Sequence, residues 1–321
     1  MCWENFKFFI IYSVCIGLSL PVSAGADVLA LDSALNTTYN ACAGISNDLT
    51  NLKKMAGINT AVTAVGTVAG GVALGAGIAK ANVDQEQKAL EEKVARLIAE
   101  KSNIPIETIE IADQAEFQRQ LSAVTGATNS EISADQQKIA ELEQKSKTLG
   151  NVRTGTLATS TATNVAGAII AGTNNVDKDL ENRIENCKKA VDNLQRSVAQ
   201  ARIDGEDISK AQQVITACRE YNYVDISTIN SKSKGAMISS IVGATTGAVG
   251  TITSASANSD STRADNTESG KQKEQNLNTA SNVMAGASTV ASVGATIFNA
   301  TQIGAIKKLV TVADKCEEAF R

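Results

Sequence analysis

The sequence contains no histidine, and it has very few proline and aromatic residues. Histidine is the usual general base near neutral pH, the partner of a catalytic serine and the commonest zinc ligand. Paired carboxylates such as Glu91 with Glu92 lie in heptad-patterned segments and are typical of solvated helix faces. We therefore predict no catalytic residues, no metal site, no cofactor and no small-molecule substrate.

The scarcity of proline and aromatic residues also restricts the fold. Proline disrupts helix interiors more than any other residue, and Pro105 is the only proline beyond residue 21. Only 3% of the residues are aromatic, whereas thick cores usually depend on large apolar and aromatic side chains. The sequence therefore predicts an all-α fold with close Ala/Gly-rich packing. A net charge of −4 offers no basic face for nucleic acid.

The N-terminus has the pattern of a secretory signal peptide. Lys7 precedes an apolar run over residues 8–20, and Ala24 and Ala26 place small residues at positions −3 and −1 of a cleavage site. We predict a signal peptide over residues 1–26, with cleavage after Ala24 or an uncleaved anchor as the alternatives. The protein is then periplasmic, secreted or at the cell surface.

Four cysteines remain after this segment, namely Cys42, Cys187, Cys218 and Cys316. An even number in an oxidising compartment suggests two disulfides, with three possible pairings. The chain shows the same order twice: a cysteine, a charge-free stretch, a charged middle, a second charge-free stretch and a cysteine. This internal repeat favours Cys42–Cys187 and Cys218–Cys316, although chance similarity in low-complexity sequence is the alternative.

The repeat predicts two tandem antiparallel helical-hairpin, coiled-coil-like units, each closed by a disulfide at its base. The first unit covers residues 27–204 and includes a charged coiled-coil arm over about 80–153. The second, shorter unit covers residues 205–321. Heptad seams over 28–52 and 180–201 each hold one cysteine in a core position. A short strand or turn is expected near residues 104–111, at the tip of the arm.

The four charge-free stretches cover residues 55–79, 154–176, 235–259 and 275–306. Glycines at short spacing let two helix backbones approach closely through van der Waals contact. We therefore predict glycine-zipper packing at Gly66, Gly70, Gly71, Gly75, Gly167, Gly172, Gly243, Gly247, Gly286 and Gly294.

Two functional interpretations follow from these stretches. In the first, they are soluble helices packed through an Ala/Gly seam, with an apolar stripe that includes Ile238, Ile241 and Ile252 and with Ser and Thr on the other face. The protein is then an exported structural or interaction protein whose partner is another protein or itself. In the second, the stretches are long enough to cross a bilayer, and the protein is membrane-active, forming a pore or inserting into lipid.

Overall fold

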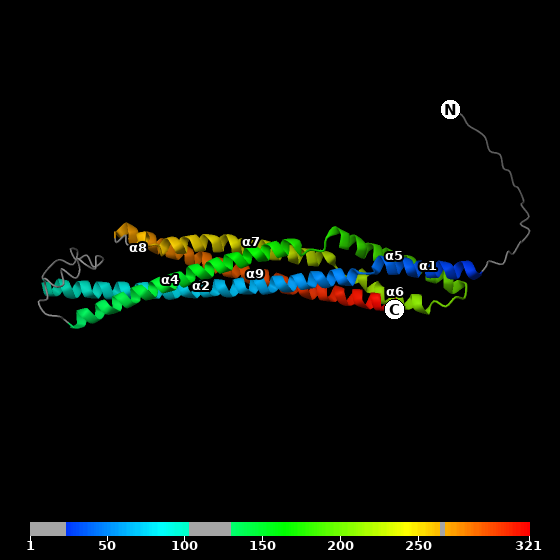
Figure 1. The fold of residues 1–321 in the computed structure, drawn as a ribbon, viewed down its shortest axis with the longest axis horizontal. Helices are drawn as coiled ribbons and strands as arrows, with labels where there is room; N and C mark the ends of the chain where they lie inside the picture. Colours follow the sequence, from blue (N-terminus) through cyan, green and yellow to red (C-terminus); the bar gives the residue numbers. More distant parts are fainter. Residues whose placement is uncertain (1–23, 103–129, 264–266) are drawn as a thin grey trace, which may run out of the picture.

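The computed structural model describes residues 24–102, 130–263 and 267–321, and every regular element in these ranges is a helix. The helices form a long, narrow rod (Figure 1). They are α1 (Ala24–Cys42), α2 (Ile45–Ser102), α4 (Ser130–Thr173), α5 (Lys178–Ile203), α6 (Ser209–Cys218), the 3₁₀ helix η2 (Arg219–Tyr223), α7 (Ile226–Ala257), α8 (Asp260–Arg263) and α9 (Glu268–Ala319).

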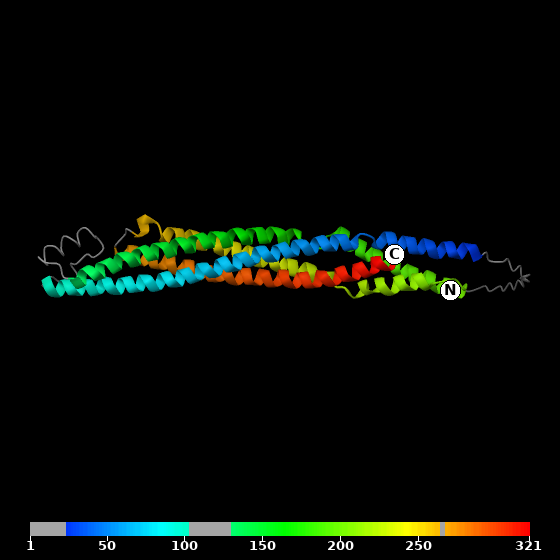
Figure 2. The ribbon, with the colours of Figure 1, turned by 60° about the horizontal axis from the view of Figure 1, so that its bottom comes forward.

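The middle of the rod is a four-helix bundle. Helices α2, α4, α7 and α9 follow one another around it, and each packs mainly on its two neighbours rather than on the helix diagonally opposite. Successive helices run in opposite directions along the rod (Figures 1 and 2). The helices of the two sequence halves therefore share one bundle, with α2 on α9 and α4 on α7.

One end of the bundle is here called the loop end, and among the described residues only α2 and α4 extend beyond it. Past the start of α9, these two helices continue as a pair with a small apolar core of Val94, Ile98 and Ile132. Lys93 and Asp135 form an ion pair of 2.9 Å across the pair. The strand or turn expected near 104–111 lies outside the described residues.

The other end, here called the disulfide end, is a separate layer of helices with an apolar core. Helix α1 packs on α5, and α6 packs on α5 and on the last turns of α9. The core contains large apolar side chains such as Leu49, Leu194 and Tyr221, all with no exposed surface. Gly44 and Gly205 make the turns into α2 and α6 with φ of 78° and 79°, a conformation that favours glycine.

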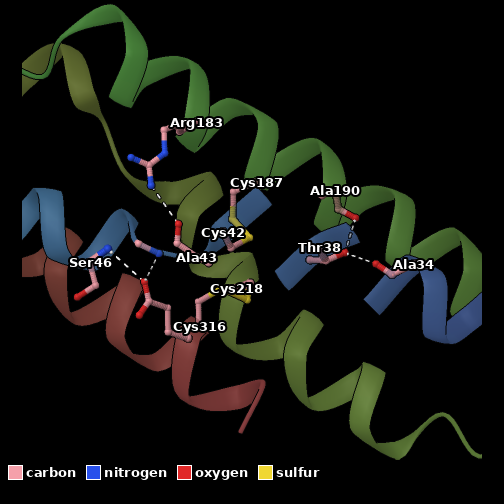
Figure 3. The surroundings of a disulfide bond; sticks show 12 residues. Ala34, Thr38, Cys42, Ala43, Ser46, Arg183, Cys187, Ala190, Cys218 and Cys316 are labelled. Atoms are coloured by element: carbon pink, nitrogen blue, oxygen red, sulfur yellow. Dashed lines mark hydrogen bonds between the residues drawn. A yellow bond between two sulfur atoms is a disulfide. The ribbon is translucent and has the colours of Figure 1, made fainter. Parts of the chain in front are cut away.

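Two disulfides cross this end, Cys42–Cys187 and Cys218–Cys316, the pairs that the repeat suggested (Figure 3). The first joins α1 to α5, and the second joins α6 to α9. The expectation that each bridge closes the base of a hairpin is wrong, because neither bridge links α2 to α4 or α7 to α9. Three of the cysteines lie on α1, α5 and α6, beyond the bundle, and Cys316 lies in the last turns of α9, so the bridges hold this end layer together and tie it to α9.

Most of the expected signal peptide, residues 1–23, lies outside the described residues. Helix α1 begins at Ala24, before the expected cleavage position.

Candidate functional site

The bundle has an unusual interior, which we call the polar seam. In each of the four helices, every third or fourth residue is buried, and nearly all of these residues are small or polar. The polar seam consists of Ala56, Asn59, Thr63, Gly66, Gly70, Ala73 and Gly77 on α2; Leu157, Ser160, Asn164, Gly167 and Ala171 on α4, with Asn174 directly after it; Ser233, Ala236, Ser240, Gly243, Gly247, Gly250 and Ser254 on α7; and Ser281, Ala285, Ser288, Ser292, Ala295, Asn299 and Gln302 on α9.

Hydrogen bonds connect both neighbouring and diagonally opposite helices across the polar seam. Asn59 on α2 donates to Asn299 on α9 at 2.9 Å. Asn164 on α4 donates to Ser292 on α9 at 2.9 Å. Ser288 on α9 donates to the Gly243 carbonyl on α7, also at 2.9 Å. Side chains of the four helices therefore hydrogen-bond one another inside the bundle, and the exceptions in the polar seam are the amide oxygens of Asn59 and Gln302 and the hydroxyl of Ser240, which are buried without a partner.

The outer surface of the same section is apolar, and we call it the apolar belt. Val290, Val68 and Ile252 are 72%, 67% and 65% exposed, so these side chains contribute almost nothing to the core. The apolar belt consists of Met55, Ile58, Val65, Val68, Val72 and Ile78 on α2; Val152, Val165 and Ile169 on α4; Ile238, Ile241, Val242, Val249 and Ile252 on α7; and Val283, Val290, Val293, Ile297 and Phe298 on α9. The stripe of α7 isoleucines noted in the sequence thus faces outward.

Threonines between the belt residues do not make the surface strongly polar. The hydroxyls of Thr156 and Thr159 on α4 donate to the carbonyls four residues earlier at 2.8 and 3.0 Å. Thr245 and Thr253 on α7 do the same at 2.9 and 3.0 Å. A threonine that donates to its own helix uses its hydroxyl hydrogen locally, which is the bonding that makes Ser and Thr tolerable where water is scarce.

The charge-free stretches of the four helices lie at the same level of the rod. Asn59 bonds Asn299 near the disulfide end, whereas Gly77 lies against Arg153 and Asn282 near the loop end. The 18 residues between Asn59 and Gly77 correspond to about 27 Å of helix. Between these two levels, the polar seam and the apolar belt form one continuous section without charges.

Two buried cations mark the loop-end border of this section. Arg153 is fully buried and donates to Ser254, Asn282 and Asn278 at 2.9, 3.0 and 2.6 Å. Lys80 is 1% exposed and pairs with Asp84 at 2.7 Å and with Glu274 at 3.4 Å. Both of these side chains point inward and are bonded inside the bundle.

The structure divides the ten predicted zipper glycines. A Cβ atom built on Gly66, Gly70, Gly167, Gly243 or Gly247 would lie 2.6–2.8 Å from a side chain of a neighbouring helix. A Cβ on Gly172 or Gly294 would lie at ordinary or slightly tight distance, 3.3 and 3.4 Å. Gly71, Gly75 and Gly286 would meet nothing within 4 Å, because they lie off the seam. Sequence spacing missed Gly250, whose Cβ would approach Met284 to 3.1 Å.

The cysteine sulfurs and a surface groove lie at the disulfide end. The Sγ atoms of Cys42, Cys187 and Cys316 are within 4.8 Å of one another, but disulfide bonds hold all three. A groove of about 670 Å³ lies beside them and is lined in part by Tyr39 and Phe320. Its carboxylate Glu317 accepts the N–H groups of Gly44 and Ser46 at 3.0 and 3.3 Å, which places it as a cap at the start of α2.

Among the described residues, three helical stretches are long and apolar enough to cross a membrane, Ala30–Glu100, Ile226–Ala257 and Ser269–Ala319. Only 39%, 28% and 28% of their most apolar windows are buried. Helix α4 is more polar and is not among them. Comparison with protein-family models, with curated proteins and with solved structures finds no match to this chain.

Proposed function

We propose that this chain is an exported, non-enzymatic helical protein whose bundle inserts into a lipid bilayer, with the apolar belt against the acyl chains. The inserted section would hold the disulfide end on one side of the membrane and the charged extension of α2 and α4 on the other. These two ends would present helical surfaces to protein partners. The observation that carries the proposal is the inverted bundle, with its polar seam inside and its apolar belt outside.

The apolar belt is unfavourable in water and favourable in lipid. Burying a Val or Ile side chain is worth about 1.5–3 kcal/mol in water, and the belt leaves that stabilisation unused for Val68, Ile252, Val290 and the rest of its members. Inside a bilayer the same surface costs nothing, because lipid tails are as apolar as the side chains. The polar seam then supplies the helix–helix contacts that membranes favour, namely small residues and interhelical hydrogen bonds.

The dimensions of the section also support insertion. The bundle is free of charges over about 27 Å, and the hydrocarbon core of a bilayer is about 30 Å thick. Small residues and threonines keep each helix less apolar than an ordinary membrane span. We infer that this moderate character suits a chain that is exported first and enters its membrane afterwards.

Export rests on the predicted signal peptide and on the disulfides. The two bridges are compatible with an oxidising compartment outside the cytoplasm. We propose that residues 1–26 direct export to the periplasm or the cell exterior. The repeated order of cysteines and charge-free stretches supports an origin of the bundle as two tandem helical hairpins. The glycines of the seam would act as a zipper that brings the helices close together in lipid.

Two alternatives for the same surfaces lead to different behaviour. In the first alternative, a second copy of the chain covers the belt in water, and the protein is a self-associating interaction protein that does not enter lipid. A pore would need an open polar path, whereas the side chains of the polar seam bond one another across the bundle. We therefore propose insertion without a pore.

The test is flotation of the oxidised protein with neutral vesicles, followed by a high-salt wash and a dye-release assay. A belt variant carries Val68→Asp, Ile252→Asp and Val290→Asp. A matched control carries Asn182→Asp, Gln195→Asp and Ala199→Asp, which adds the same charge on exposed positions of α5.

We expect the wild type and the control to float and to resist the wash without releasing dye. The belt variant should stay at the bottom, because each charge in the middle of a bilayer costs about 2.5–3.5 kcal/mol. Helical wild-type protein that stays at the bottom as a concentration-dependent oligomer would refute insertion and favour self-association through the belt. Dye release by the wild type would indicate that the inserted protein forms a pore, and it would contradict insertion without a pore.

A further inference from the structure

We propose that a collar of six lysines at the disulfide-end border of the bundle binds anionic lipid headgroups. This inference rests on the proposed membrane insertion and adds to it the lipid class and the side of the bundle that meets it. The lysine collar consists of Lys53, Lys54, Lys232, Lys234, Lys307 and Lys308.

The collar lies directly at the edge of the charge-free section on three of its four helices. Lys54 precedes Met55 on α2, Lys234 precedes the α7 stretch, and Lys307 follows the α9 stretch. The Lys232 ammonium donates to the Thr301 carbonyl at 3.3 Å, so α7 and α9 are in register here. Because Lys307 lies only six residues beyond Thr301, the α9 lysines are about 9 Å further along the rod.

The collar lysines are not neutralised by the protein. Lys54, Lys234, Lys307 and Lys308 are exposed, and Lys53 and Lys232 are half-buried. Within the described ranges, none of the six takes part in an ion pair. Unpaired cations of one sign at this position are available to an external anion.

The fourth corner of the collar is different. Where α4 passes into α5, the chain carries Asp177, Lys178 and Asp179. Asp177 accepts the Leu180 N–H at 2.7 Å as the N-cap of α5. The single-sign surface therefore covers the α2, α7 and α9 sides of the bundle.

Among the described residues, the loop-end border has no collar of a single sign. Two of its cations, Lys80 and Arg153, are buried and bonded inside the bundle, as described above. The carboxylates Asp84 and Glu274 lie beside them. The exposed Lys271 and Lys273 also precede the charge-free stretch of α9, but they stand next to Glu274. The loop-end border is therefore mixed in charge, whereas on α2, α7 and α9 the disulfide-end edge of the charge-free section carries lysines alone.

The chemistry of lysine fits a headgroup at this depth. Its long apolar stem can lie along the upper edge of the belt while the ammonium reaches the phosphate layer. Clusters of four to eight basic residues beside a membrane segment bind anionic leaflets, each residue contributing a few-fold to the affinity. The contribution is electrostatic, so salt screens it.

The experiment measures binding of the full oxidised chain to two kinds of vesicle, pure phosphatidylcholine and phosphatidylcholine with about one third phosphatidylglycerol. The collar variant carries Lys54→Gln, Lys234→Gln and Lys308→Gln. The control carries Lys88→Gln, Lys145→Gln and Lys271→Gln, which are exposed lysines of the loop end and its extension. Both variants change the net charge by the same amount.

The wild type and the control should bind the anionic vesicles more tightly than the neutral ones. The collar variant should lose that preference, with anionic binding weaker by roughly a hundredfold for three lysines and with neutral binding unchanged. If the collar variant and the wild type preferred anionic vesicles equally, headgroup binding by the collar would be refuted, whereas the proposed insertion would stand. An equal loss in the control would assign the preference to net charge and also overturn it. Absence of binding to both vesicles would remove the membrane proposal itself.

Discussion

The disulfide end and the middle of the bundle use the same kind of helix in opposite ways. At the disulfide end, side chains such as Leu49, Ile184 and Leu194 point inward and have no exposed surface. In the middle, Asn59 and Asn164 occupy the corresponding inward positions, and valines and isoleucines point outward. One chain therefore combines a section organised for water with a section organised for an apolar surrounding.

The environment of Tyr221 illustrates the first kind of packing. Burial in the apolar core of the disulfide end raises the pKa of its hydroxyl well above the ordinary value, and the Glu317 carboxylate adds to the effect. The middle section instead fills its interior with hydroxyl and amide groups that bond one another. We therefore expect most of the stabilisation by apolar burial in water to come from the disulfide end.

The largest expected effect in water is therefore loss of a bridge at that end. Cys218→Ala together with Cys316→Ala opens a loop with a sequence separation of 98 residues. The chain-entropy model predicts a loss of about 4–5 kcal/mol in the free energy of unfolding. Chemical denaturation followed by circular dichroism measures it, and a loss below about 1 kcal/mol would show that the bridge adds little to this end.

A matched pair of apolar truncations compares the two regions directly. Leu49→Ala removes a fully buried side chain from the core of the disulfide end and should cost about 2–5 kcal/mol of unfolding free energy. Val68→Ala truncates a belt residue that is 67% exposed and should change stability in water by no more than about 0.5 kcal/mol. Denaturation of both variants in detergent-free buffer tests the contrast. Equal losses would mean that the belt is buried in solution, by self-association.

The smallest effect distinguishes two adjacent glycines of α2. A Cβ on Gly70 would lie 2.6 Å from the Thr289 hydroxyl and 3.3 Å from the Thr289 Cα, so Gly70→Ala should destabilise the bundle by about 1 kcal/mol or more. Gly71 faces open space, so Gly71→Ala should stabilise α2 by about 0.5–1 kcal/mol. Thermal unfolding of the two variants should shift in opposite directions. Shifts of the same sign would place both glycines on one face and contradict the seam.

Several features could be predicted from the sequence because they depend on local chemistry. The all-helical fold follows from the near absence of proline, and the cysteine pairs follow from the repeated order of flanking residues. The four charge-free stretches are also evident in the sequence. Glycine spacing did not separate Gly70, which the structure buries, from Gly71, which faces open space.

Other features depend on which helices meet, and only the tertiary structure decided them. The four charge-free stretches lie at one level because α2 packs on α9 and α4 on α7, contacts between residues more than two hundred positions apart in the first case. The helices joined by each disulfide also follow from this arrangement.

Composition by itself determined that this chain is helical, disulfide-bonded and poor in the side chains that fill a thick core. It could not determine which face of each helix would turn inward, because Ala, Gly, Ser and Thr on one face and Val and Ile on the other satisfy the helical period in either orientation. The tertiary structure made that choice, and it turned the polar face inward. The physical reason is close packing: small side chains let four backbones approach, and their hydroxyl and amide groups bond one another only when they meet inside the bundle.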